Sequence, residues 1–227
     1  MSLKAVAFDI DGTLYPNVAM VWKSLPLFFA NIPLIHGLNE VRKDIRHNPE
    51  KGDFHHIQAR RLAKKLRISP EKAHALVESK VYTRWYRIFP KLSLYKGLVD
   101  TIESIRSWGL KTAVMSDFPI RNRLKDLGVG EGWDTVFSSE ETGYLKPRCE
   151  PFLEIATRLQ VLPKEVLYVG NSYGYDVIGA KGAGMLVAHL TKRNRSNSLA
   201  DFNFSKYEDL KNYVEKLIQG QVPGRQT

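Results

Sequence analysis

The 227-residue sequence predicts an α/β protein, a doubly wound parallel sheet with an all-α segment inserted after its first strand. Short apolar segments alternate with segments of helical periodicity from residue 98 onward, which is typical of parallel βαβ units. The first apolar segment, Lys4–Ile10, is instead followed by a long stretch in which only helical patterns occur. These observations predict an α/β core formed by residues 1–16 and 93–227 and an inserted helical module formed by residues 17–92.

The distribution of charge supports the same division. Residues 17–92 hold 15 Lys/Arg and 6 Asp/Glu, a net charge of +9, whereas the rest of the chain carries +1 of the total of +10. A strongly basic block beside a nearly neutral one indicates two modules. The basic block lacks the pattern of a recognised nucleic-acid module, so no nucleic-acid partner is expected.

Local signals define the elements of the N-terminal part. Gly12 and Pro16 end the first strand, and Ser69 is expected to cap a helix that begins at Pro70. The expected elements are a strand over Lys4–Ile10, helices over His56–Leu66 and Lys72–Tyr86, and a linker over Pro90–Gly97.

The C-terminal part shows the alternation that predicts the parallel sheet. Gly109 and Gly128 each end a helix, as glycine commonly does. The expected strands are Lys111–Met115, Thr135–Ser138, Val166–Val169 and Met185–His189. The expected helices are Leu98–Trp108, Pro119–Leu127, Glu150–Leu159, Tyr175–Lys181 and Tyr207–Ile218.

Composition excludes several classes of protein. Hydrophobic residues make up 43% and charged residues 26%, an ordinary globular balance. The single cysteine, Cys149, excludes an internal disulfide framework and a multi-cysteine zinc site, and it favours a reducing, cytoplasmic location. The most apolar stretch, Val18–Leu38, is interrupted by Lys23 and prolines, so we expect no membrane span. It is expected to form either the core of the inserted helical module or a dimer surface, which leaves monomer and homodimer open.

Polar side chains follow the ends of the predicted strands. Ligands bind at the carboxyl ends of strands in doubly wound sheets, so these side chains are expected to converge. They are Asp9, Asp11, Ser116, Asp117, Lys146, Asn171 and Asp176.

The run Asp9-Ile10-Asp11-Gly12-Thr13-Leu14 carries the strongest chemical signal. Its two carboxylates, placed together as the chain leaves the strand, need a cation or a shared proton. Magnesium satisfies the first need, and a substrate phosphate would share the ion. One carboxylate near phosphorus is suited to nucleophilic attack, and a protonated second one to general acid/base catalysis.

This run resembles the first signature of the haloacid dehalogenase-like superfamily, whose fold is Rossmann-like. The other signatures follow in order as Ala113–Asp117, Lys146-Pro147 with Pro151-Phe152, and Val169–Ser172 with Asp176. Such ordered blocks are much more specific together than singly. The resemblance implies a phosphatase-type enzyme whose helical cap is inserted after the first signature.

The resemblance also implies residue roles. Asp9 is expected to be the nucleophile and a metal ligand, and Asp11 the general acid/base and a metal ligand through its backbone carbonyl. Ser116 and Lys146 are expected to act in catalysis by binding the phosphate. Asp117 is placed with the phosphate-binding residues, with capping of a helix from Pro119 as its alternative.

The fourth signature departs from the family pattern. The family usually has an acid where this chain has Asn171, and an amide supplies no negative charge. Asp176 is therefore expected to hold the metal, helped by the amide oxygen of Asn171. The loss of one anion is expected to weaken magnesium binding.

The resulting hypothesis is a magnesium-dependent hydrolase of a small phosphorylated metabolite that acts through an aspartyl-phosphate intermediate. Asp11 favours a phosphatase over a dehalogenase of the same superfamily, because those dehalogenases lack the second Asp. A phosphomutase shares all four signatures and stays open. A weakly active or non-catalytic regulatory binding protein on the same scaffold is the alternative from another class. The sequence leaves the substrate unspecified.

Overall fold

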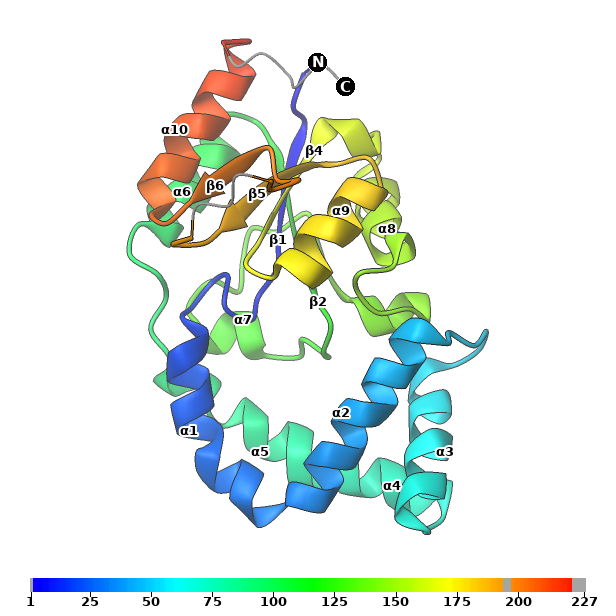
Figure 1. The fold of residues 1–227 in the computed structure, drawn as a ribbon. Coiled ribbons are helices and arrows are strands. Elements are labelled where there is room, and N and C mark those ends of the chain that lie inside the picture. The colour runs from blue at the N-terminus through cyan, green and yellow to red at the C-terminus, as the bar shows by residue number, and fades with distance from the viewer. Residues whose placement is uncertain (1, 194–196, 222–227) are drawn as a thin grey trace.

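The computed structural model describes residues 2–193 and 197–221 of the chain. In that part, six parallel strands form one sheet in the order β3-β2-β1-β4-β5-β6 (Figure 1). The strands are β1 Ala5–Phe8, β2 Lys111–Ser116, β3 Thr135–Ser138, β4 Val166–Gly170, β5 Leu186–Leu190 and β6 Phe202–Phe204. The predicted doubly wound parallel sheet is confirmed.

Both faces of the sheet are covered by helices, so β1 is apolar throughout rather than alternating. Its Val6 and Phe8 pack in one apolar cluster with α6 (Leu98–Ser107) and α10 (Tyr207–Ile218). The other cluster contains Ala5 and Ala7 and residues of α8 (Cys149–Leu159) and α9 (Ile178–Gly182). These two layers hold β1 rigidly in the centre of the sheet.

The segment between β1 and α6 contains no strand among the described residues. Its elements are α1 Asn17–Ala30, α2 Ile32–His47, α3 Phe54–Leu66, α4 Pro70–Leu76, the π-helix η1 Val77–Tyr82, α5 Thr83–Tyr86 and the 3-10 turn η2 Phe89–Lys91. The Ser69 hydroxyl caps α4, as predicted, by accepting a hydrogen bond from the backbone N–H of Lys72. The helix predicted over Lys72–Tyr86 is divided by the π-helix.

These helices have an apolar cluster of their own, whose buried members come from the inserted segment except for Leu145. In Figure 1 they lie together at one end of the sheet, beyond the loop that follows β1. The division of the chain into a core of residues 1–16 and 93–227 and a cap of residues 17–92 stays a prediction; in the structure α1 begins at Asn17 and η2 ends at Lys91.

The apolar stretch Val18–Leu38 is divided between exposed and buried positions. Trp22 and Phe29 of α1 are exposed, whereas Leu34 and Leu38 of α2 are buried in the cap cluster. Among the described residues, no helix combines the length and the apolar character needed to cross a membrane.

The predicted helix over Pro119–Leu127 is wrong, because the structure forms only the short α7, Arg123–Asp126. Arg121 has a φ of 45°, in the left-handed region, so no regular helix passes through it. Asp117 consequently caps no helix there.

Two other predictions are adjusted. The helix expected over Tyr175–Lys181 consists of the π-helix η5, Tyr173–Val177, followed by α9. The edge strand β6, Phe202–Phe204, was not predicted because three residues are too few to show a period. The remaining elements are the 3-10 turns η3 Ser139–Thr142 and η4 Pro163–Glu165.

Candidate active site

The strand ends bring the predicted site residues to one edge of the sheet. Phe8 of β1 is in register with Val114 of β2 and Val169 of β4. The backbone N–H of Asp9 donates to the carbonyl of Val169 at 2.9 Å, so Asp9 leaves the sheet between its two neighbouring strands. This register dictates that residues following β1, β2 and β4 face one another.

Lys146 joins two of the predicted acids. Its Nζ donates to Asp9 Oδ1 at 2.6 Å and to Asp176 Oδ1 at 2.9 Å, and all three side chains are buried. Burial raises the pKa of Asp9 to about 7, while the Lys146 ammonium lowers it and the Asp176 carboxylate raises it. Burial alone would lower the pKa of Lys146, but Asp176 and Asp9 raise it well above its usual range. Lys146 therefore stays cationic between two carboxylates.

Asp11 is held in a neighbouring cluster rather than by Lys146. Ser116 Oγ donates to Asp11 Oδ2 at 3.1 Å, and the Tyr15 hydroxyl donates to Oδ1. The fully buried Arg123 donates to Asp11 Oδ1 at 2.5 Å and to Ser116 Oγ at 3.0 Å. Its guanidinium lies 4.7 Å from the ring centroid of Trp85. Asp11 thus lies one residue beyond the end of the apolar core and is paired with the buried Arg123 guanidinium.

The turn after Asp11 requires a glycine. Gly12 has a φ of 87°, and a Cβ at this position would lie 2.3 Å from the amide nitrogens of Asn17 and Asn171. The Thr13 hydroxyl donates to Asp9 Oδ2 at 2.9 Å and to Asn171 Oδ1 at 3.3 Å. Two oxygens from different strand ends are therefore within reach of one hydroxyl.

These oxygens fit a magnesium ion in chemical type. Carboxylate, amide and carbonyl oxygens are the ligands that this cation takes. Gly170 also makes room for Asp176, since a Cβ at Gly170 would lie 2.5 Å from the Asp176 carboxyl carbon. No group of three or more His, Cys, Asp or Glu side chains suited to a metal occurs in the described part of the chain. A cation at this edge would thus depend on the Asn171 amide and backbone oxygens besides Asp9 and Asp176.

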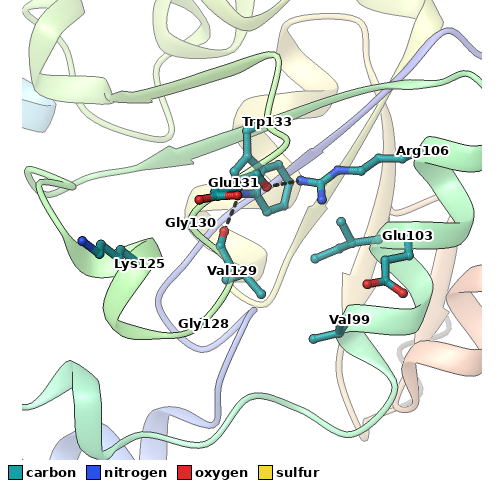
Figure 2. A pocket seen from close by; sticks show the side chains of 10 residues that line it. Val99, Glu103, Arg106, Lys125, Gly128, Val129, Gly130, Glu131 and Trp133 are labelled. Atoms are coloured by element: carbon teal, nitrogen blue, oxygen red, sulfur yellow. Dashed lines mark hydrogen bonds between the residues drawn. The ribbon is translucent and has the colours of Figure 1, made fainter.

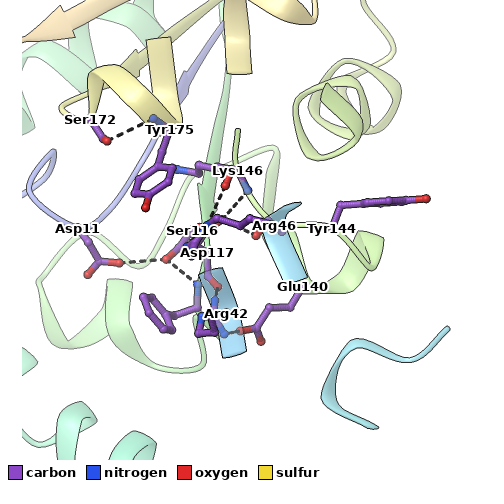
Figure 3. A network of polar contacts seen from close by, with 12 residues as sticks. Asp11, Arg42, Arg46, Ser116, Asp117, Glu140, Tyr144, Lys146, Ser172 and Tyr175 are labelled. Atoms are coloured by element: carbon purple, nitrogen blue, oxygen red, sulfur yellow. Dashed lines mark hydrogen bonds and ion pairs between the residues drawn. The ribbon is translucent and has the colours of Figure 1, made fainter. Parts of the chain in front are cut away.

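The Asp117 side chain binds the loops beside the two clusters. Its Oδ1 accepts hydrogen bonds from Ser139 Oγ at 2.7 Å and from the Lys146 backbone N–H at 3.1 Å, and Oδ2 pairs with Arg46 at 2.7 Å (Figure 3). Burial would raise its pKa, but Arg46, Lys146 and Arg42 together lower it below its usual range. A phosphate oxygen would be repelled by this ionised carboxylate, so the side chain organises the loops instead of offering a phosphate ligand.

Two arginines of α2 were missed by sequence reasoning. Arg42 donates to Glu140 Oε1 at 2.5 Å and to the backbone carbonyl of Asp117, and Arg46 donates to the carbonyl of Lys146 at 2.9 Å (Figure 3). Two arginines one helical turn apart on α2 therefore bind the backbone carbonyls of both loops that carry site residues. Arg42 lies on the buried face of α2, next to Val41. A charged residue on an apolar face was the available signal.

Two cavities differ in how near they lie to the carboxyl ends of the strands, where the site residues meet. A cavity of about 320 Å³ is lined by α6 and by residues 128–133, including Arg106 and Trp133 (Figure 2). Those residues precede β2 and β3, so the cavity lies at the amino ends of the strands, away from Asp9. A cavity of about 230 Å³ is lined by Asp11 together with residues of α1, α2 and η1. Only the second of these opens on the converged residues.

Comparison with known proteins agrees with this geometry. The family model described as haloacid dehalogenase-like hydrolase matches residues 3–184. The chain is 30% identical over 240 residues to glyceraldehyde 3-phosphate phosphatase of Methanopyrus kandleri, covering 96% of this chain and 99% of that protein. The enzyme of the same name from Methanothermobacter thermautotrophicus is 30% identical over 191 residues, 81% of this chain and 83% of that protein.

The fold is also found in solved structures. The HAD-hydrolase YfnB of Bacillus subtilis, solved with bound magnesium, superposes with a TM-score of 0.68 at 19% identity, covering 95% of this chain and all of that one. From the buried acid-lysine-acid constellation at the strand ends, the matching family model and the full-length relatives, it follows that the chain belongs to the haloacid dehalogenase-like hydrolase family.

Proposed function

We propose that this hydrolase is a magnesium-dependent phosphatase that cleaves a small phosphomonoester through an aspartyl-phosphate on Asp9. The observation that carries the proposal is the setting of Asp9, a buried carboxylate between the Lys146 ammonium at 2.6 Å and the Thr13 hydroxyl at 2.9 Å. The full-length relatives, named as phosphatases of a phosphorylated aldehyde, support the same reaction class.

In the first step an Asp9 carboxylate oxygen attacks phosphorus, and the bond from phosphorus to the ester oxygen breaks. The leaving oxygen takes a proton from Asp11 and departs as the alcohol. Lys146 offsets the negative charge that Asp9 and the phosphate bring together. The Ser116 hydroxyl, which points toward Asp11 at 3.1 Å, is placed to donate to a phosphate oxygen.

In the second step Asp11 takes a proton from water, and the water oxygen attacks phosphorus. The bond between phosphorus and the Asp9 oxygen breaks, which releases inorganic phosphate and regenerates Asp9. Arg123 and Tyr15 hold Asp11 in place between the two steps. The same carboxyl thus serves first as acid and then as base.

Asp9, Asp176 and Asn171 are the side chains that would hold magnesium, with the Asp11 backbone carbonyl. The ion would supply positive charge to the phosphate oxygens when bound. Asn171 brings no negative charge, so this site is expected to bind magnesium more weakly than one with a third carboxylate. His189 keeps Asn171 in place through a contact of 3.1 Å from its ring Nε2 to the Asn171 carbonyl.

The experiment is hydrolysis of para-nitrophenyl phosphate by the purified chain with magnesium, and after its removal with EDTA. We expect activity that requires magnesium and that Asp9→Asn lowers at least about a thousandfold. The matched control is Asp209→Asn, an exposed acid of α10, which should leave activity unchanged. Phosphate release that is insensitive to Asp9→Asn would contradict the proposal.

A further inference from the structure

The cavity beside Asp11 indicates the substrate class. Under the proposed function, on which this inference rests, Asp11 protonates the leaving alcohol, so that alcohol must lie within hydrogen-bonding reach of Asp11. Asp11 lines the cavity of about 230 Å³, whereas Asp9 and Lys146 do not line it. The phosphate therefore lies outside this cavity, and the alcohol lies in it.

The wall of the cavity is apolar and aromatic. Trp85 and Phe118 meet edge to face with their ring centroids 5.0 Å apart, and Leu38 is buried in the same wall. The remaining apolar lining residues are Met20, Val21, Ile35 and Val81. Aromatic rings packed in this way present a firm surface to a ligand.

Apart from Asp11, the polar groups of the wall are few and neutral. The Trp85 indole N–H and the Ser24 hydroxyl both donate to the Met20 sulfur, at 3.0 and 3.4 Å, and the Tyr82 hydroxyl accepts from Arg42 at 3.4 Å. The amides of Asn17 and Asn39 are the other polar lining groups that can meet a ligand.

No Lys, Arg or His occurs among the described residues that line the cavity, although residues 17–92 carry a net charge of +9. A second anionic group on the substrate would therefore be desolvated there beside Asp11 without a cation to pair with. An uncharged group meets no such cost.

We propose that the substrate is the phosphate monoester of an uncharged, mainly apolar alcohol about the size of one aromatic ring with a short linker. An apolar cavity of about 150 Å³ binds benzene. The cavity here, about 230 Å³, has room for such a ring and a linker to the ester oxygen. A substrate whose alcohol part carries a carboxylate or a second phosphate is disfavoured.

The test compares three esters of primary alcohols, so that the acidity of the leaving group decides little: phenethyl phosphate, ethyl phosphate and phosphoglycolate. Release of phosphate is measured with magnesium. We expect kcat/KM for phenethyl phosphate to exceed that for ethyl phosphate at least about tenfold, and phosphoglycolate to be the poorest of the three.

Two matched variants of α1 test whether the preference for phenethyl phosphate arises from this cavity. Val21 lines the cavity and Val18 on the same helix does not, although the two side chains are similarly exposed, at 53% and 67%. Val21→Phe should lower kcat/KM for phenethyl phosphate about tenfold and spare ethyl phosphate, and Val18→Phe should change neither. Asn39→Lys, at an exposed lining position, should raise the relative activity on phosphoglycolate several-fold.

The outcomes separate the inference from the proposed function. Hydrolysis of ethyl phosphate and phosphoglycolate as fast as phenethyl phosphate overturns the substrate class and leaves the phosphatase standing. A Val21→Phe enzyme that loses activity on all three esters equally also overturns it. Failure to hydrolyse any phosphate ester overturns the proposed function and the inference together.

Discussion

Replacing the buried ion pair between Arg42 of α2 and Glu140 of η3 is expected to reveal how the helical insertion is fastened to the sheet. Both side chains are at most 2% exposed, and Arg42 also donates to Gln58 and to the Asp117 carbonyl. Burial raises the pKa of Glu140, and the Arg42 guanidinium opposes that rise. Arg42→Met leaves Glu140 buried without its cation.

Breaking a buried pair in this way costs about 3–5 kcal/mol of the free energy of unfolding, and Glu140→Gln should cost a similar amount. The double variant removes both charges. Its loss of unfolding free energy should be at least about 2 kcal/mol smaller than the sum of the losses in the single variants.

Urea unfolding followed by tryptophan fluorescence measures these free energies. The same cycle on Arg60 and Glu50, an ion pair with side chains 52% and 41% exposed, is the control and should show much weaker coupling. Additive effects of Arg42→Met and Glu140→Gln would refute the view that this pair fastens the insertion.

Two further predictions concern the site and a third concerns the packing of α9. Asp11→Asn should lower kcat/KM, which reports the first step, about 100- to 10,000-fold on ethyl phosphate but far less on dinitrophenyl phosphate, whose leaving group needs no proton; equal losses of kcat/KM would contradict a general-acid role. Asn171→Asp should lower the magnesium concentration needed for half-maximal activity, and an unchanged requirement would remove Asn171 from the metal site. Gly179→Ala should destabilise the fold by about 1–3 kcal/mol in a thermal or urea melt, because its Cβ would lie 2.3 Å from the Phe152 ring, whereas Gly174→Ala, with open space at its Cβ, should cost little.

The sheet could be predicted from the sequence because its strands are short, apolar and separated by clear breaks. The strand over Thr135–Ser138 and the helix over Tyr207–Ile218 agree with the structure residue for residue. The helix predicted from Pro119 failed because Arg121 takes a left-handed conformation, which no local pattern announces.

The site could be predicted in part. Asp9, Lys146 and Asp176 meet as the order of strand ends implies, since neighbouring parallel strands end at one edge. The Asp117 carboxylate pairs with Arg46 instead, and the Arg123 guanidinium donates to Asp11. Those partners come from helices whose packing is decided by tertiary contacts, so neither spacing nor periodicity indicates them.

Trapping the phosphorylated enzyme tests the central claim most directly. The chain is mixed with phenethyl phosphate and magnesium, quenched in acid during turnover, reduced with borohydride to mark any acyl phosphate, and mapped by peptide mass spectrometry. The account predicts a mark on Asp9 that disappears in Asp9→Asn and accumulates in Asp11→Asn when the substrate is dinitrophenyl phosphate, because that variant forms the intermediate but hydrolyses it slowly. A mark on another residue, or turnover with no marked residue at all, would contradict it.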